Sequence, residues 1–207
     1  MQFHPQRLLL ASAVVLLSAG AQASPIYDNL NSTQDGSDPI LSYGPLANSF
    51  MTGADANTVL SSISALLKNG SNSLVGDIKL SLHADASNAP GAELLSLGLF
   101  SSTGVSTSAF AAYDFSLSTP YALAANTTYW VELEASSPNA IEWSWSGDLA
   151  ATGVAGQSNY NALFGSNPNT SFAPYQMAVN VSAVPEPSSL LLLALGLGLV
   201  GLTARRR

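Results

Sequence analysis

Apolar and polar side chains alternate with a period of two through the middle of the chain, and this alternation restricts the fold more than any other feature. It recurs in four segments, at residues 77–85, 127–135, 140–146 and 174–183. In the first of them, Ile78, Leu80 and Leu82 would point to one side, and Lys79 and His83 to the other. A strand with one buried and one wet face has this period, so the pattern predicts half-buried strands.

Three further strands are predicted at 58–67, 92–100 and 113–117, and turn residues such as Asn69-Gly70 separate the segments. No long stretch between the two ends of the chain keeps helical spacing. Short strands at this pitch predict an all-β body, an antiparallel β-sandwich of the jelly-roll type. Because the chain has no cysteine, an aromatic and aliphatic core must stabilise this body.

The first 23 residues have the three parts of a secretory signal peptide. Arg7 supplies a basic start, an apolar run follows from Leu8 to Ala19, and Ala21-Gln22-Ala23 has the small-x-small form that signal peptidase cuts. We expect cleavage after Ala23, so that the mature chain begins at Ser24. The apolar run is shorter than the ~20 residues that a spanning helix needs, which argues against a permanent anchor.

The C-terminal segment, residues 184–207, also has three parts. Val184-Pro185-Glu186-Pro187 comes first, an uncharged run follows from Leu190 to Thr203, and Arg205, Arg206 and Arg207 end the chain. With the flanking serines and Ala204, the uncharged stretch is just long enough to cross a bilayer. Since arginines stay on the cytoplasmic side, we predict a C-terminal transmembrane helix with its Arg tail inside and the body outside.

These three parts, in this order, resemble a PEP-CTERM protein-sorting signal, a segment that also carries the label ice-binding protein C-terminal domain. The label is not an ice-binding activity of this chain. The resemblance implies an exported protein of a Gram-negative bacterium, processed by signal peptidase and by an exosortase-type membrane protease. It implies an intermediate anchored in the inner membrane, then a place at the cell surface or in the extracellular matrix. It also implies a link to exopolysaccharide and biofilm.

The body, residues 24–183, resembles a second family. The segments DIKLSLHADASNAPGAELLSL, at 77–97, and LSTPYALAANTTYWVELEAS, at 117–136, are similar to a choice-of-anchor domain, most of all to type R. Such domains are extracellular and bacterial, and occur with different C-terminal anchors. The resemblance implies a surface or matrix role and carries no catalytic residues. The chain thus divides into a signal peptide at 1–23, a β-sandwich at 24–183 and a sorting signal at 184–207.

The body is strongly acidic. Lys68 and Lys79 are its only basic residues besides His83, and it holds twelve of the 13 acids, so its formal charge is −10. Binding of nucleic acid requires clustered Lys and Arg, so we predict no nucleic-acid partner. The absence of cysteine excludes thiol catalysis, iron–sulfur clusters and disulfides.

Candidate catalytic residues are few. His83 would have to be the base of any Ser-His-Asp triad, but the alternation places it on a wet strand face, and no G-x-S-x-G motif is present. Glu132 and Glu134 share a strand face, with Glu142 on the following segment, and paired carboxylates can hydrolyse glycosides. Neighbours at i and i+2 point in parallel rather than across a cleft. We therefore predict no enzyme activity, with a hydrolase of matrix polysaccharide as an alternative.

Oxygen-bearing side chains cluster near the start of the body, at Asp28, Asn29, Asn31, Asp35 and Asp38. Calcium takes such ligands, although the spacing is not that of an EF-hand loop. A calcium site here or near Asp85 and a solvated loop are both open interpretations. One histidine and no cysteine leave too few good ligands for zinc, and we predict no cofactor.

The three tryptophans are expected to play two roles. Trp143 and Trp145 share a face with Ile141 and are predicted to fill the core. Trp130 faces the opposite way from Tyr129 and is the candidate surface aromatic, able to stack on a sugar. The sequence therefore predicts an exported, non-enzymatic surface or matrix protein. A carbohydrate-binding module that contacts exopolysaccharide through Trp130 is an alternative.

Overall fold

The computed structural model describes residues 24–55, 58–71, 74–149, 153, 158–168 and 173–183. These residues form strands almost throughout, with one short helix, α1 (Ile40–Tyr43), and one 3-10 turn, η1 (Ser102–Gly104). The strands in chain order are β1 (Ser24–Asp28), β2 (Gly36–Pro39), β3 (Leu46–Met51), β4 (Thr58–Asn69), β5 (Asp77–Asp85), β6 (Pro90–Ser101), β7 (Ala111–Ala122), β8 (Thr128–Ala135), β9 (Ile141–Trp145), β10 (Ser158–Asn161), β11 (Gly165–Pro168) and β12 (Met177–Ala183).

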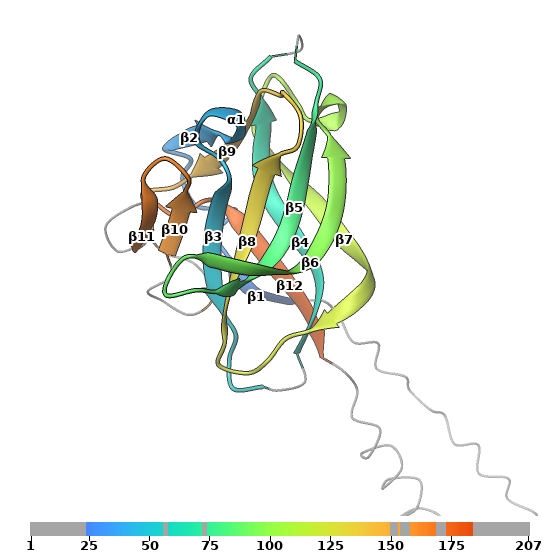
Figure 1. The fold of residues 1–207 in the computed structure, drawn as a ribbon, viewed down its shortest axis with the longest axis vertical. Helices are drawn as coiled ribbons and strands as arrows, with labels where there is room; N and C mark the ends of the chain where they lie inside the picture. The colour runs from blue at the N-terminus through green and yellow to red at the C-terminus, as the bar shows by residue number, and fades with distance from the viewer. Residues whose placement is uncertain are drawn as a thin grey trace, which may run out of the picture.

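The strands form two antiparallel sheets (Figure 1). The first sheet has the order β1-β12-β4-β9-β2, with β7 also paired to β4, and the second has the order β11-β10-β3-β8-β5-β6. The prediction of an all-β, antiparallel body is confirmed, and all seven predicted strands are present, as β4 to β9 and β12. The strands that lack clear alternation, β1, β2, β3, β10 and β11, were not predicted from the sequence.

One hydrophobic core cluster takes side chains from both sheets. Ile63 and Leu67 of β4 belong to it together with Leu80 of β5 and Leu133 of β8, and each of these is fully buried. The alternation therefore identified the inner face of β5 correctly. Phe50 stacks on Tyr129 within the same cluster, with ring centroids 5.8 Å apart.

The outer face of the second sheet is also partly buried, because the turn between β5 and β6 folds back over it (Figure 1). Register shifts between Leu80 and Asp85 bend the pairing of β5 with β6. Beyond the bend, Asn88 Oδ1 accepts a hydrogen bond from Ser158 Oγ of β10, at 2.8 Å. The turn thus reaches from one edge strand across the sheet toward β10. The side chains beneath the β5–β6 turn were predicted to be exposed to solvent, but the turn buries them.

The two ends of the described body lie side by side. β1 pairs antiparallel with β12, and Ser24 lies opposite Val181. The chain therefore enters and leaves the body at the same end of the first sheet (Figure 1). Among the described residues, no helix has the length and hydrophobicity to cross a bilayer. The predicted signal peptide and C-terminal helix lie outside the described residues.

Candidate functional site

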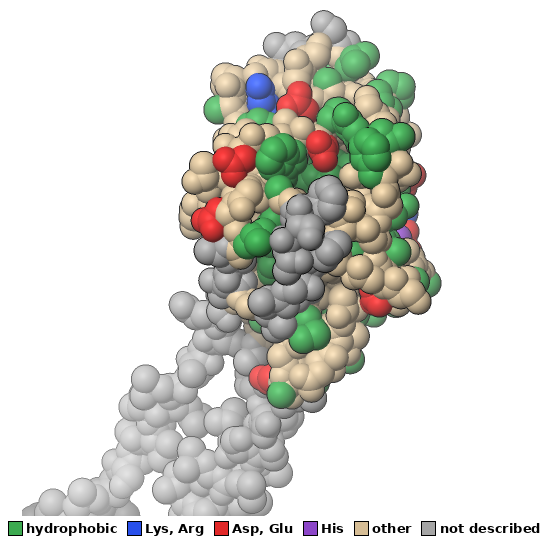
Figure 2. Space-filling view, turned by 90° about the vertical axis from the view of Figure 1, so that its left-hand side faces the viewer, with side chains coloured by type: hydrophobic (Ala, Val, Ile, Leu, Met, Phe, Trp, Pro, Cys, Tyr) green, Lys and Arg blue, Asp and Glu red, His purple; other side chains and the backbone are tan. Residues whose placement is uncertain are grey.

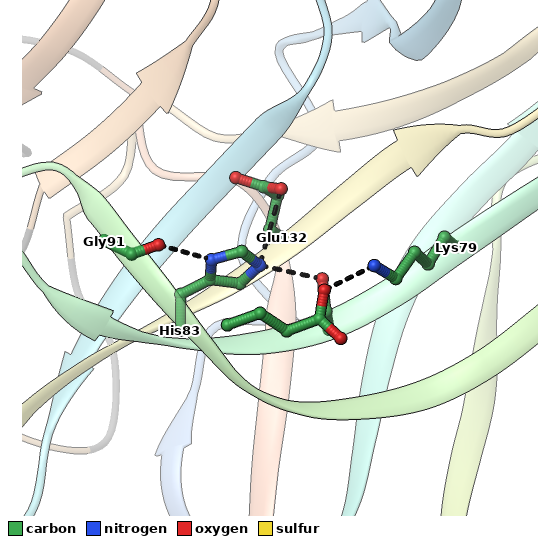
Figure 3. Close-up of polar contacts among 6 residues, drawn as sticks. Lys79, His83, Gly91 and Glu132 are labelled. Carbon is green, nitrogen blue, oxygen red and sulfur yellow. Dashed lines mark hydrogen bonds and ion pairs between the residues drawn. The ribbon is translucent and has the colours of Figure 1, made fainter.

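A buried polar cluster lies under the β5–β6 turn, and it contains His83 (Figure 3). His83 Nδ1 is 2.9 Å from the carbonyl oxygen of Gly91, and His83 Nε2 is 2.9 Å from Ser81 Oγ. Glu132 of β8 approaches from the other side, with Oε1 3.5 Å from Nε2. The prediction that His83 is a solvated strand residue is wrong, since only 9% of its surface is exposed.

These contacts fix the tautomer of the His83 ring. A carbonyl oxygen only accepts, so Nδ1 carries a proton, and in the neutral ring Nε2 then accepts from the Ser81 hydroxyl. A serine bonded to a histidine that a third group orients is the arrangement of an activated nucleophile. However, Ser81 is 1% exposed in the middle of a strand. In this structure the Ser81 Oγ is therefore not accessible to a substrate.

Charged side chains lie at the edge of this cluster. Burial raises the pKa of the Glu132 carboxyl, with the charge of Glu134 adding to the effect and His83 opposing it. Lys79 forms an ion pair with Glu93 across β5 and β6, and that hydrogen bond raises the pKa of Lys79. The burial of Glu132 thus disfavours the charged form of its carboxyl.

The three glutamates considered as hydrolytic partners do not meet. Glu132 and Glu134 lie on β8 in the second sheet, and Glu142 lies on β9 in the first sheet. Glu142 accepts a hydrogen bond from Ser37 Oγ at 2.8 Å and lies opposite Lys68 on β4. The structure therefore assembles no carboxylate pair from these residues.

The oxygen-bearing residues near the start of the body form hydrogen bonds to different partners. Asp28 accepts from the backbone of Leu30, Asp35 from that of Gly147, and Asp38 from the Tyr175 hydroxyl. Asn29 bonds to the backbone of β12 at Met177. Within the described ranges, no group of three Asp, Glu or His side chains is close enough together to hold a metal ion.

Trp130 is not a surface residue. Its side chain is fully buried on the outer face of β8, and its Nε1 donates to Asp85 Oδ1 at 2.8 Å. Asp85 belongs to the end of β5, where the overlying turn begins, and this contact closes the turn over the indole. The expectation that Trp130 is exposed to a ligand is therefore wrong. The period-two pattern gives its side of the strand correctly but not the cover above it.

The two other tryptophans differ from each other. Trp143 is fully buried and stacks on Tyr175 at 4.8 Å, and its Nε1 donates to the carbonyl of Gln176, as expected of a core residue. Trp145 is only partly buried and lines a pocket where β2, β9, β10 and β11 meet. The prediction that both fill the core therefore holds for Trp143, while Trp145 lies between core and surface.

This pocket, which we call the amide pocket, has a volume of about 470 Å³. Small-molecule sites span roughly 300–1,000 Å³. Its lining includes Asp38, Trp145, Asn159, Asn161, Phe164 and Tyr175. Figure 2 views the side on which β10 and β11 lie, and hydrophobic side chains gather in a hollow there with acidic side chains around it. The pocket thus combines amide groups with aromatic surfaces.

Polar contacts hold the walls of the amide pocket. Tyr175 donates its hydroxyl to Asp38 Oδ2 at 2.6 Å, and burial together with this bond raises the pKa of Tyr175 far above its ordinary value. The phenol therefore stays protonated and keeps β2 tied to the segment before β12. Asn159 donates its Nδ2 to the carbonyl of Ala173 at 2.6 Å. Asn161 Oδ1 accepts from the backbone of Phe164 and shapes the β10–β11 turn.

Comparison with known proteins concerns the tail. Residues 183–207 match the PEP-CTERM protein-sorting motif. No curated protein matches the chain. The motif indicates an exported surface protein that is targeted to the exosortase system. The resemblance of the body to a choice-of-anchor domain, and the ice-binding label, find no support in these comparisons. The motif residues Val184 to Pro187 and Arg205 to Arg207, and the cleavage residues Ala21 and Ala23, lie outside the described residues.

The amide pocket was missed by the analysis of the sequence. Its amides belong to β10 and β11, whose sequences, SNYN and GSNP, contain no apolar alternation. The available signal was compositional: asparagines at 159, 161 and 167 surround the exposed aromatic Phe164. That composition also fits an ordinary loop, so only the fold shows that these residues converge on Trp145.

Proposed function

We propose that this chain is a non-enzymatic protein of the bacterial cell surface or extracellular matrix, sorted through its tail by an exosortase-type protease and associated with exopolysaccharide. The sorting motif at residues 183–207 carries the proposal. In this proposal residues 1–23 are a cleaved signal peptide, and the run before the arginines is a transmembrane helix that anchors an inner-membrane intermediate. The two sheets, which share one core, would form a jelly-roll-like sandwich.

The geometry of the body supports this arrangement. Ser24 lies opposite Val181, so the expected signal-peptidase site and the start of the tail emerge together. A body held by its tail would therefore point both ends toward the membrane and the rest of the two sheets away from it. The buried Ser81 and the separated glutamates favour a binding or structural role over a hydrolytic one. No cofactor is part of the proposal.

Variants of the sorting motif in the natural host test the proposal. The double variant Pro185→Ala, Pro187→Ala removes the two residues that hold the motif extended and out of a helix. The matched control is Ser188→Ala, Ser189→Ala, directly after the motif. We expect the wild type and the serine control in the surface or medium fraction, and the proline variant in the membrane fraction with its tail attached. Release of the proline variant at the wild-type level would contradict the proposal.

A further inference from the structure

We propose that the amide pocket binds a neutral sugar, as the end or a side branch of a matrix polysaccharide. This inference rests on the proposed function only for the cellular location, the cell surface or extracellular matrix, in which the protein would encounter such a ligand. Three observations bear on the ligand class: an unpaired buried amide oxygen, partly exposed aromatic rings and the charge of the lining. A fourth, the position of the pocket relative to the tail, bears on where the ligand is met.

The unpaired group is Asn159 Oδ1. The Asn159 side chain is 8% exposed, and among the described residues its Oδ1 has no hydrogen-bond partner. Because Nδ2 donates to the carbonyl of Ala173, the amide cannot flip without facing two oxygens toward each other. Buried polar atoms are nearly always paired, so this acceptor of a pocket-lining residue calls for a donor beyond the described residues, and a ligand hydroxyl is a donor of the required kind.

Carboxamide side chains are better hydrogen-bond partners for hydroxyl groups than charged side chains are. Each carboxamide both donates and accepts, as each sugar hydroxyl does. Asn159, Asn161 and Asn167 all line the pocket, from two paired strands. Register places Asn159 opposite Asn167, so their amides approach the same part of the pocket. Adjacent hydroxyls on a pyranose ring can bond to such neighbouring amides.

Aromatic rings supply the apolar side of the site. Trp145 lines the pocket from the end of β9, and Phe164 lines it from the β10–β11 turn with 69% of its surface exposed. Phe164 is supported by Tyr43 of α1, with ring centroids 6.2 Å apart. The C–H face of a sugar packs on rings of this kind, which leaves its hydroxyls free for the amides.

Charge selects a neutral ligand. The described lining contains no lysine or arginine, and its carboxylate, Asp38, already accepts from Tyr175. The body carries a formal charge of −10. A uronic-acid or phosphorylated polymer would therefore be repelled and would find no cationic partner in the pocket.

The pocket also lies at the far end of β12 from the tail. Tyr175, which lines it, precedes Ala183, the last residue of β12, by eight residues. Extended chain of that length covers about 27 Å. A body tethered by its tail would hold the pocket away from the membrane, where extracellular polysaccharide is met.

Binding is measured with the exported chain purified in detergent and followed by tryptophan fluorescence. Trp130 and Trp143 are fully buried, so a change on adding sugar reports Trp145. The probes are cellotetraose, mannotetraose and chitotetraose, which are neutral, and tetragalacturonate, which is anionic. We expect saturable binding of at least one neutral probe and none of tetragalacturonate. Failure of all three neutral probes, or preferred binding of tetragalacturonate, would overturn the inference and leave the sorting proposal intact.

Two variants on one turn localise the binding. Phe164→Ala removes a lining ring, and Leu163→Ala removes an apolar side chain that is 60% exposed beside it but does not line the pocket. We expect Phe164→Ala to weaken binding roughly three- to tenfold, and Leu163→Ala to change it by less than about twofold. Asn159→Ala, checked for an unchanged circular-dichroism spectrum, should weaken it similarly. Equal affinities of the Phe164 and Leu163 variants would refute the site.

Discussion

Glu132 shows how a single side chain is shaped by its cover. It lies beside His83 under the β5–β6 turn, with 9% of its surface exposed, while Glu134, two residues further along β8, is exposed. Burial raises the pKa of Glu132, and Lys79, His83, Glu93 and Glu134 are the charged or titratable groups that act on it. β8 thus holds the Glu132 carboxylate in a buried position that costs stability, and the Glu134 carboxylate in an exposed position.

Glu132→Gln should stabilise the protein in a pH-dependent way. The raised pKa means that the folded state binds a proton more readily than the unfolded state, so stability falls as pH rises from the ordinary carboxyl pKa to the raised one, and stays low above it. Thermal unfolding should show a higher Tm for the variant at pH 8 and a vanishing difference below about pH 4. Glu134→Gln is the comparison: it removes only the contribution of the Glu134 charge to the raised pKa of Glu132, so it should raise the Tm at pH 8 by less. A Tm difference that is the same at both pH values would contradict this account.

Trp143 and Trp145 provide a second test. Trp143→Ala should cost about 3–5 kcal/mol of unfolding free energy, because it empties a fully buried site stacked on Tyr175. Trp145→Ala removes a partly exposed ring and should cost clearly less. Urea unfolding measures both. Equal losses would show that the two indoles are equally part of the core, as their shared strand face suggested.

Among the elements, strands with regular alternation were predictable and the others were not. β5 was predicted with its observed bounds, and β8 and β9 within one residue at each end, because each has one apolar face. β3 is buried on both faces, and β10 and β11 are polar, so none of them carries a period of two. The cover over Trp130 depends on bulges and on a contact between Asn88 and Ser158, which lie far apart in sequence.

The pairing of β2 with β9 depends on a small residue. Gly36 lies opposite Trp145, and a Cβ at Gly36 would fall 2.2 Å from the indole ring. Gly36→Ala should therefore displace Trp145, cost roughly 1–3 kcal/mol and weaken any ligand binding in the amide pocket. Gly104→Ala, where a Cβ would meet nothing within 4 Å, is the control. Urea unfolding and tryptophan fluorescence measure the effect, and an unchanged indole signal would argue against this packing.

At the scale of the whole molecule, the sequence identifies the sorting tail, and the structure identifies the amide pocket. The tail was recognisable because its motif, apolar run and arginines are adjacent in sequence, and the match at residues 183–207 confirms the motif. The amide pocket was not recognisable, because Asp38, Trp145 and Asn159 come together only when β2, β9 and β10 do. Together they describe an acidic β body with both of its ends at one side and a candidate ligand site far along β12.

Mass spectrometry of both termini, on protein recovered from the medium and envelope of its own host, tests the central claim most directly. The account predicts a chain that starts at Ser24 and has lost Arg205 to Arg207 through a cut at or near Val184–Pro187. An intact chain from Met1 to Arg207, recovered from the cytosol, would contradict it.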